Sequence, residues 1–505
     1  MKWRGLVLTT IGLLGLLAGP ANAAPATRVF TDRGPVQGAM TGEVRSFQGI
    51  PFAKPPVGAL RWRAPQPAAR WREPLDATKP REFCAQLPGF GPSESVNEDC
   101  LYLNVTTPRR VNRPLPVIVW YHGGGFTSGA ATQYDPVKLV TQGNVIVVTV
   151  AYRLGPLGYL ATPGLTAEAG NQSGNYGFQD QLAGLRWVQR NAAAFGGNPG
   201  NVTISGESAG AASVCDVIVS PLAKGLFQKA IGQSFSCVEE TTTPQQAYAA
   251  GAQLSSTVGC ADVACLRGKP VKDLLTAWPG GAPVVGGREL PLQPPDAIRQ
   301  GKYHRVPLLW GSNLDEMRLF VGLTYDGAGK PVTVAQYEQV TRDTFGPAAD
   351  KVLARYPVGN YASPSIALAT WQTDVPGHLS TCGHINTYNL FKTGAPVYAY
   401  QFTDRTAPSI VDWPNFDEGA THAFELNYLW NRLFGQPFTP AQEALSKNMV
   451  RYWTTFAHTG NPNGYGVPGW QRYKSEGDVQ ELGLARIAPK NPALESNCEF
   501  WAGLG

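Results

Sequence analysis

The stretch that decides the fold is residues 201–220, NVTISGESAGAASVCDVIVS. It opens with a β-branched run at 202–204, turns through Gly-Glu-Ser-Ala-Gly at 206–210, and continues with small residues at helical spacing. A Gly-x-Ser-x-Gly turn between a strand and a helix is a nucleophile elbow, which lifts its serine, here Ser208, clear of the sheet. Glycines are needed on both sides because Cβ atoms there would collide with the neighbouring strand and helix. The motif is short and the chain holds 57 glycines, so its interpretation depends on what surrounds it.

The segments around this turn predict an α/β fold. Helical periodicity runs through residues 175–195, between apolar strands, and the alternation of strand and helix favours a mostly parallel central sheet with helices on both faces. We expect an antiparallel edge hairpin within 28–50, an ordered coil at 51–74, and helical cap insertions after about residue 240. The predicted sheet strands are residues 101–105, 116–121, 145–152, 202–204, 229–233, 306–311 and 396–402.

The N-terminus has the three regions of a secretory signal peptide. Lys2 and Arg4 precede an apolar run at 5–18, and small residues follow up to Ala23. The apolar run is shorter than the roughly 20 residues that a membrane anchor needs. We therefore expect a signal peptide at 1–23, cleavage after Ala23, no stable membrane anchor afterwards, and a secreted protein. The remaining residues, 24–505, contain no repeat or low-complexity linker and are expected to form a single domain.

Composition excludes several classes of protein. With 43% apolar and 16% charged residues, the 505-residue chain is able to bury a large core. Its net charge of +5 falls to +3 without Lys2 and Arg4, and the other basic residues are scattered, which argues against a nucleic-acid partner. Eight cysteines in an exported chain predict disulfides, because no metal-ligand spacing is present; no metal is expected. Spacing suggests short loops closed by Cys84 with Cys100 and by Cys260 with Cys265, and leaves unpaired Cys215, Cys237, Cys382 and Cys498.

A glycine-rich segment before the elbow has the character of an oxyanion hole. The strand at 116–121 runs directly into His-Gly-Gly-Gly-Phe at 122–126. Consecutive glycines leave backbone N–H groups unshielded, and the N–H of Ala209 is a further donor. The alternative, a flexible loop or a phosphate cradle, is disfavoured because no Gly-x-Gly-x-x-Gly pattern fits and no P-loop Lys-Ser/Thr follows.

A serine nucleophile also needs a histidine base and a carboxylate that holds the histidine, in the chain order Ser, acid, His. An acid is wanted just after a strand end, and either Asp315 or Glu316, after the strand at 306–311, meets this requirement. The histidines downstream of Ser208 are His304, His378, His384, His422 and His458.

With these motifs the chain resembles the type-B carboxylesterases, a family of the α/β-hydrolase superfamily. The likeness spans nearly the whole mature chain. The matching motifs are FQGIPFA at 47–53, EDCLYLNV at 98–105, HGGGF at 122–126, AYRLG at 151–155, GESAG at 206–210 and NPNG at 461–464.

The resemblance implies particular roles. It selects Glu316 as the acid, although Met317 stands where the family has glycine, and it selects His422 as the base, within GATHAFELNY at 419–428. Glu207 resembles the family's buried carboxylate that supports the imidazolium. The other histidines are then structural.

The family pattern also implies disulfides and ion pairs. It pairs Cys84 with Cys100, Cys260 with Cys265, and Cys382 with Cys498, and it leaves a bridge between Cys215 and Cys237 open. The pairs Arg61 with Glu98 and Arg153 with Asp180 resemble structural ion pairs of the family.

The expected function is that of a serine hydrolase that cleaves small carboxylic esters through a covalent acyl-enzyme, without a cofactor. Gly124, Gly125 and Ala209 would hold the oxyanion. Two alternatives remain: an interfacial lipase or polyester hydrolase, which would depend on the cap at 240–400, and a non-catalytic binding member, which the intact Ser208, Glu316 and His422 disfavour. The case for cholinesterase activity is weaker still. Choline recognition needs an aromatic cage for the cation, and the cholinesterases of this family place a tryptophan for it in the first disulfide loop, whereas the loop at 85–99 contains none here. Acyl-chain and alcohol preference and oligomeric state are not predicted.

Overall fold

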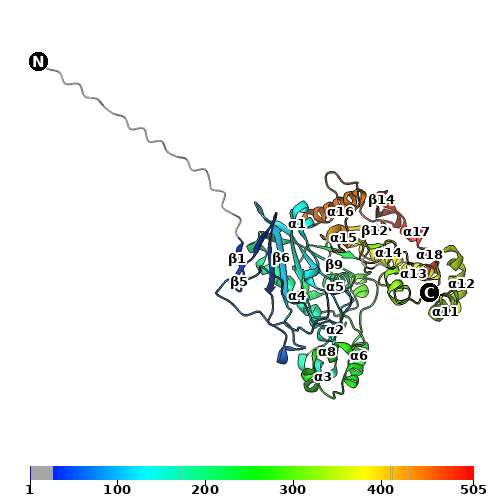
Figure 1. The fold of residues 1–505 in the computed structure, drawn as a ribbon, viewed down its shortest axis with the longest axis horizontal. Helices are drawn as coiled ribbons and strands as arrows, with labels where there is room; N and C mark the ends of the chain where they lie inside the picture. Colours follow the sequence, from blue (N-terminus) through cyan, green and yellow to red (C-terminus); the bar gives the residue numbers. More distant parts are fainter. Residues whose placement is uncertain are drawn as a thin grey trace.

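The structure is a computed structural model that describes Met1 and residues 27–170, 172–409, 411, 413, 415–431 and 433–504. Apart from Met1, the predicted signal peptide at 1–23 lies outside the described residues. Figure 1 shows a central sheet with helices packed on both of its faces and further helices gathered at one end.

The main sheet has eleven strands in the order β14-β13-β12-β11-β10-β9-β7-β8-β6-β4-β3. The seven strands from β13 to β8 pair in parallel, whereas β14, β6, β4 and β3 pair antiparallel at the two ends. This arrangement confirms the predicted α/β class. The strands are β3 (Ala39–Thr41), β4 (Val44–Pro51), β6 (Tyr102–Pro108), β7 (Leu115–Tyr121), β8 (Ile146–Val150), β9 (Gly197–Glu207), β10 (Lys229–Gln233), β11 (Leu308–Asn313), β12 (Val397–Phe402), β13 (Val479–Leu482) and β14 (Ile487–Lys490).

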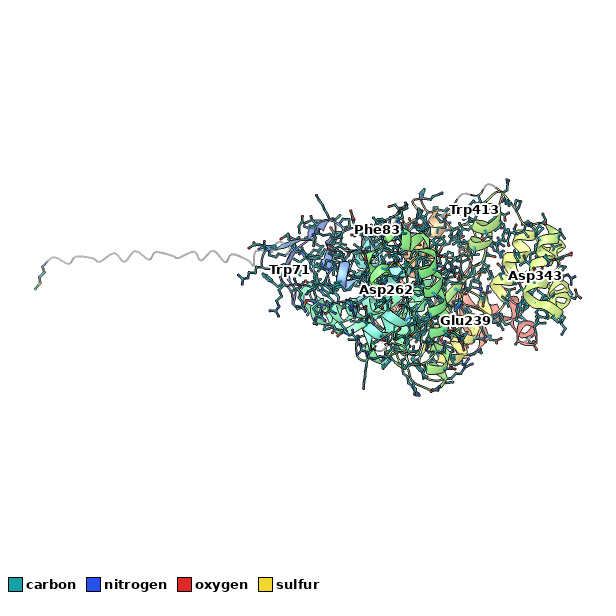
Figure 2. All side chains as sticks on the ribbon, turned by 90° about the horizontal axis from the view of Figure 1, so that it is seen from below. Trp71, Phe83, Glu239, Asp262, Asp343 and Trp413 are labelled. Atoms are coloured by element: carbon teal, nitrogen blue, oxygen red, sulfur yellow. A yellow bond between two sulfur atoms is a disulfide. The ribbon has the colours of Figure 1, made fainter. Side chains whose placement is uncertain are left out.

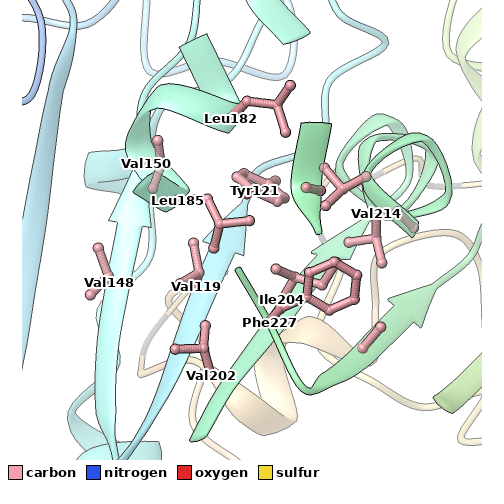
Figure 3. Packing of buried hydrophobic residues seen from close by; sticks show 14 of the residues in the cluster. Val119, Tyr121, Val148, Val150, Leu182, Leu185, Val202, Ile204, Val214 and Phe227 are labelled. Atoms are coloured by element: carbon pink, nitrogen blue, oxygen red, sulfur yellow. The ribbon is translucent and has the colours of Figure 1, made fainter. Parts of the chain in front are cut away.

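The central strands are apolar on both faces because both faces are covered. All seven residues of β7 are buried, and alternate residues enter different cores. Val117 and Val119 join one hydrophobic cluster, and Ile118 and Trp120 join the other. Figure 3 shows the first cluster, where valines of β7, β8 and β9 meet leucines of α4 and Val214 of α5.

Two groups of helices supply these cores. The first cluster includes residues of α4 (Tyr176–Asn191), α5 (Ala209–Val219), α9 (Pro294–Arg299) and α14 (Thr381–Phe391). The second includes residues of α1 (Val137–Gly143), α15 (Leu426–Leu429) and α16 (Pro440–Thr459). The elbow helix α5 is buried at every position, so its start is fixed relative to the sheet.

Two helical extensions stand beside the sheet, each with its own apolar cluster. The first extension contains α2 (Gly155–Tyr159), α3 (Pro163–Ala169), α6 (Pro244–Thr257), α7 (Val263–Gly268) and α8 (Val271–Thr276). The second contains α10 (Arg318–Val321), α11 (Val334–Phe345), α12 (Ala349–Arg355), α13 (Pro364–Asp374) and α18 (Cys498–Ala502), whereas α17 (Pro492–Glu495) contributes Ala493 to the first cluster of the sheet. Figure 2 shows Asp343 of α11 at the end of the molecule opposite Trp71. Among the described residues, no helix has both the length and the apolarity to cross a membrane.

The N-terminal strands differ from the prediction. The expected edge hairpin within 28–50 is two units: β3 and β4 pair at the edge of the main sheet, whereas β1 (Arg28–Phe30) and β2 (Pro35–Gln37) form a separate sheet with β5 (Leu75–Asp76). The strand β5 lies directly after the predicted coil at 51–74, so its pairing with β2 is a long-range contact that local alternation does not reveal. The strands β13 and β14 were also not predicted, because each has only four residues.

Four disulfides connect the eight cysteines. Three of them are Cys84–Cys100, Cys260–Cys265 and Cys382–Cys498, and the fourth, which the sequence left open, is Cys215–Cys237. The fourth bond ties the elbow helix α5 to the segment that follows β10.

Two arginine–carboxylate pairs lie near the first extension. Arg61 donates two hydrogen bonds to Glu98, at 2.7 and 2.6 Å. Arg153 donates from Nε and Nη2 to the two oxygens of Asp180, at 2.7 and 2.8 Å. Asp180 is fully buried, and burial raises the pKa of its carboxyl although Arg153 opposes this effect. The Arg153–Asp180 ion pair is therefore shielded from water, and removing either partner would leave the charge of the other buried and uncompensated.

We predict that Asp180→Asn lowers the free energy of unfolding by about 3–5 kcal/mol, because it leaves the Arg153 charge buried without a counter-charge. Urea unfolding followed by tryptophan fluorescence measures this loss. The control is Glu94→Gln in the exposed pair with Lys272, which should cost less than about 1 kcal/mol. Equal losses of unfolding free energy in the two variants would contradict the description of Arg153–Asp180 as a buried ion pair.

Candidate active site

The elbow holds Ser208 in a backbone conformation that side-chain-bearing residues rarely adopt. Its φ is 55° and its ψ is −125°, between the last residue of β9 and the first of α5. The Ser208 N–H donates to the carbonyl of Gln233 on β10 at 2.9 Å, and its carbonyl accepts from the N–H of Ala212 at 2.9 Å. The turn is thus fixed by a strand on one side and by its own helix on the other.

Glycine at 206 and 210 is required by close backbone crossing. A Cβ at Gly206 would lie 2.3 Å from the carbonyl oxygen of Gly210. A Cβ at Gly210 would lie 2.0 Å from the carbonyl oxygen of Tyr121, at the end of β7. Both distances are far below van der Waals contact, so the helix approaches the sheet only because these side chains are absent.

The glycine-rich loop after β7 presents free donors beside Ser208. Gly124 and Gly125 have φ of 107° and 61°. Within the described part of the chain, neither of their N–H groups nor that of Ala209 donates a hydrogen bond. All three residues line the same cavity as Ser208. The arrangement leaves three backbone donors for an incoming anionic oxygen.

Packing under this loop restricts its movement. The His122 ring stacks on the Tyr152 ring with centroids 4.4 Å apart. The Tyr152 hydroxyl donates to the His122 carbonyl at 2.7 Å, and the His122 ring lies at hydrogen-bond distance from the Gly123 carbonyl.

The structure brings Glu316, and not Asp315, to His422. Glu316 Oε2 lies 2.6 Å from His422 Nδ1, and Glu316 Oε1 accepts from the backbone N–H of Asn313 at 2.7 Å. Asp315 instead forms ion pairs with Arg318 at 3.1 Å and Arg405 at 2.8 Å. Both Glu316 and His422 are buried.

The other downstream histidines lie elsewhere or make other contacts. His304, His384 and His458 each have a ring nitrogen within 3.0 Å of a backbone carbonyl. His378 lines the cavity, where it stacks on Phe235 with ring centroids 4.9 Å apart.

Three buried glutamates surround the His422 ring. Besides Glu316 at Nδ1, Glu207 Oε1 lies 3.1 Å from Nε2. Glu425, three residues after His422 in the turn before α15, accepts hydrogen bonds from Gln233 at 3.0 Å and Asn313 at 2.6 Å. Glu425 was not among the residues predicted for the site, and its nearness to His422 in the sequence was the available signal.

The cluster shifts the protonation of its members. Burial lowers the pKa of His422, but the negative charges of Glu207 and Glu316 outweigh burial and raise it to about 9. Burial raises the pKa of Glu207 to about 8 and that of Glu425 to about 7. The folded cluster therefore binds protons more tightly than the unfolded chain. Its contribution to stability falls as the pH rises from the unfolded pKa values towards about 9.

The site opens into a cavity of about 1310 Å³. Its wall includes Ser208, Glu207 and His422, and it continues along α5 to Asp216. Phe320 forms part of the wall and packs against His422, with ring centroids 5.2 Å apart. A mostly apolar cavity of this size suits an organic ester. Among the described residues, no group of three or more His, Cys, Asp or Glu side chains could hold a metal ion.

The sheet and the elbow at the carboxyl ends of its parallel strands define the protein as an α/β-hydrolase. Comparison with known proteins is more specific. A sequence profile of the carboxylesterase family matches residues 25–501. The chain is 34% identical to human cocaine esterase, with 96% of this chain and 91% of that protein aligned. It is also 34% identical to a duck (Anas platyrhynchos) fatty acyl-CoA hydrolase precursor, medium chain, over 99% and 96% of the two chains.

A solved structure gives the same result. A thermophilic PNB esterase superposes with a TM-score of 0.80 and 33% sequence identity, over 95% of this chain and all of the other. The chain therefore belongs to the carboxylesterase family, and it is a carboxylic ester hydrolase.

We predict that Gly210→Ala lowers esterase kcat/KM about 100-fold, because the new methyl group would push the elbow away from the Tyr121 carbonyl and displace Ser208 by about 1 Å. Hydrolysis of 4-nitrophenyl acetate measures this loss. The control is Gly268→Ala at the end of α7, where an added Cβ meets no atom within 4 Å. Normal activity of the Gly210→Ala protein would show that the crossing is not as tight as described.

Proposed function

We propose that the protein cleaves carboxylic esters through a covalent acyl-enzyme on Ser208, with His422 as base and Glu316 as the carboxylate that orients it. The observation that carries this proposal is the 2.6 Å contact between Glu316 and His422 Nδ1. It leaves Nε2 to exchange protons, and Nε2 faces Glu207, the residue directly before Ser208.

In the first half-reaction, Ser208 Oγ attacks the ester carbonyl carbon while His422 Nε2 takes the hydroxyl proton. The carbonyl electrons move onto oxygen, and the N–H groups of Gly124, Gly125 and Ala209 stabilise the negative charge. When the intermediate collapses, the bond to the leaving alcohol breaks and His422 returns the proton to that alcohol. Water then repeats these steps on the acyl-enzyme and releases the acid.

Glu207 and Glu316 affect His422 in the same direction in this scheme. Both negative charges raise the pKa of His422 and so favour the imidazolium that forms after Ser208 is deprotonated. A more basic imidazole also holds its proton to higher pH, and a protonated imidazole is not able to act as a base. The enzyme should therefore be most active on the alkaline side of neutrality.

We also infer that the protein is exported and that residues 24–505 act as one domain. The charged, apolar and small-residue regions of 1–23 support export, and so does the pairing of all eight cysteines in disulfides. The family profile extends across nearly the whole mature chain, which supports a single functional unit.

We predict that Ser208→Ala lowers kcat by at least about 10⁴-fold, because no acyl-enzyme forms without the hydroxyl. The wild type should release 4-nitrophenol in a burst that the variant lacks, and a stopped-flow experiment measures both effects. Ser256→Ala, an exposed serine on α6, serves as the control. Undiminished turnover by the Ser208→Ala protein would disprove the mechanism.

We predict that Glu207→Gln moves the acid limb of the kcat/KM profile to lower pH. The substitution removes a negative charge next to Nε2, and this charge raises the pKa of His422. Initial rates from about pH 5 to about pH 10 report the shift. An acid limb that stays in place or moves upward would contradict this role of Glu207.

A further inference from the structure

A buried carboxylate without a partner lies in the cavity, away from the residues proposed for catalysis. Asp216, on α5, is only 3% exposed, yet it belongs to the cavity wall. Within the described part of the chain, its side chain makes no hydrogen bond and no ion pair. The hydroxyl of Tyr159, which is itself buried without a partner, makes no hydrogen bond to it either.

Such a group needs an explanation, because an unpaired buried carboxyl destabilises the fold. Burial alone raises the pKa of Asp216 well above its usual range. By contrast, Asp180 is equally buried but is held by three hydrogen bonds from Arg153. Packing therefore does not account for a carboxyl group at position 216.

The position of Asp216 relative to Ser208 is set by one face of the elbow helix. Ala212, Cys215 and Asp216 recur at helical spacing after Ser208, and all of them line the cavity. Eight residues of helix correspond to about 12 Å along its axis. The wall between the two residues consists of Ala209, Ala212 and the disulfide Cys215–Cys237, so it is apolar.

The charges of the cavity have one sign at this end. Glu239 and Glu240 follow Cys237 and also line the cavity, and no described lining residue is a lysine or an arginine. Glu239 is labelled in Figure 2. A cation is the kind of group that would be drawn to this end and would compensate Asp216.

We propose that Asp216 binds a cationic group, an ammonium ion carried by an ester whose carbonyl lies at Ser208 about 12 Å away. This inference rests on the proposed function, because the ester is placed at Ser208. An ammonium group would give the carboxylate its missing counter-charge, and an apolar spacer would lie along Ala212 and the disulfide. Charge-assisted contacts of this kind are roughly twice as strong as neutral ones.

The test compares isosteric esters that differ only in charge. One end of each ester carries a trimethylammonio group or the uncharged tert-butyl group of the same shape, on the acyl side in one series and on the alcohol side in the other. We expect wild-type kcat/KM to favour the cationic ester at least about tenfold in one series, with an optimum at a spacer of about 12 Å. The absence of any preference in both series would overturn the proposal.

Variants assign the preference to Asp216. Asp216→Asn should reduce the ratio of cationic to neutral kcat/KM to about one, whereas Asp216→Glu should retain a preference. Asp343→Asn makes the same change on the exposed surface of α11, which contributes no residue to the cavity, and should leave the ratio as in the wild type. A preference that survives in Asp216→Asn would overturn the proposal.

Two further measurements do not require catalysis. In isothermal titration calorimetry, hexyltrimethylammonium should bind the wild type and Ser208→Ala at least about tenfold more tightly than Asp216→Asn. Equal binding would overturn the cation site even if esters are hydrolysed, whereas absent hydrolysis with intact binding would count against the proposed function alone. The Asp216→Asn protein should melt at a temperature no lower than the wild type; a lower melting temperature would show that Asp216 has a structural partner and would also overturn the proposal.

Discussion

The approach of helix α5 to the end of strand β7 is the constraint on which the rest of the site depends. The Tyr121 carbonyl lies where a side chain at position 210 would have to be, and only glycine permits the contact. With the helix this close, Ser208 is forced into its positive-φ conformation at the edge where the parallel strands end. The neighbouring strands then deliver the remaining parts: β7 leads into the glycine loop, β10 supplies the Gln233 carbonyl, and β11 leads to Glu316.

Electrostatic balance is the second requirement of the site. One imidazole lies among three buried glutamates, and a low-dielectric interior does not readily hold three negative charges. Hydrogen bonds from Gln233 and Asn313 stabilise the Glu425 carboxylate, whereas Glu207 Oε1 accepts no hydrogen bond from the described residues and lies 3.1 Å from His422 Nε2. The charge of each of these groups therefore affects the protonation of the others.

Much of the fold was readable from local patterns. The strand β10 has the predicted residues, 229–233, and β7 and β12 differ from their predicted bounds by one residue. Every residue of these three strands is buried, and β7 in particular is a continuous apolar run, the pattern typical of a strand covered on both faces. The strands β5, β13 and β14 have two to four residues each, and their existence depends on partners distant in the chain.

The candidate site was predictable to a similar degree. Asp315 and Glu316 are adjacent acids after the same strand, and residue type alone did not separate them; the resemblance did, and the contact between Glu316 and His422 is consistent with it. Asp216 was not predicted as a binding residue, for a different reason. A sequence does not reveal that a carboxyl group lacks a partner, because this property depends on every side chain that the fold places around it.

The bond between Cys382 and Cys498 has a consequence for the order of assembly. It joins residues 116 positions apart and connects α14 on the sheet to α18, which packs among the helices of the second extension. The bond is unable to form until the ribosome has added every residue from 383 to 498. Whatever structure arises during synthesis, the covalent closure of this extension is a late event, and the oxidant that completes it acts on a chain that is almost fully made.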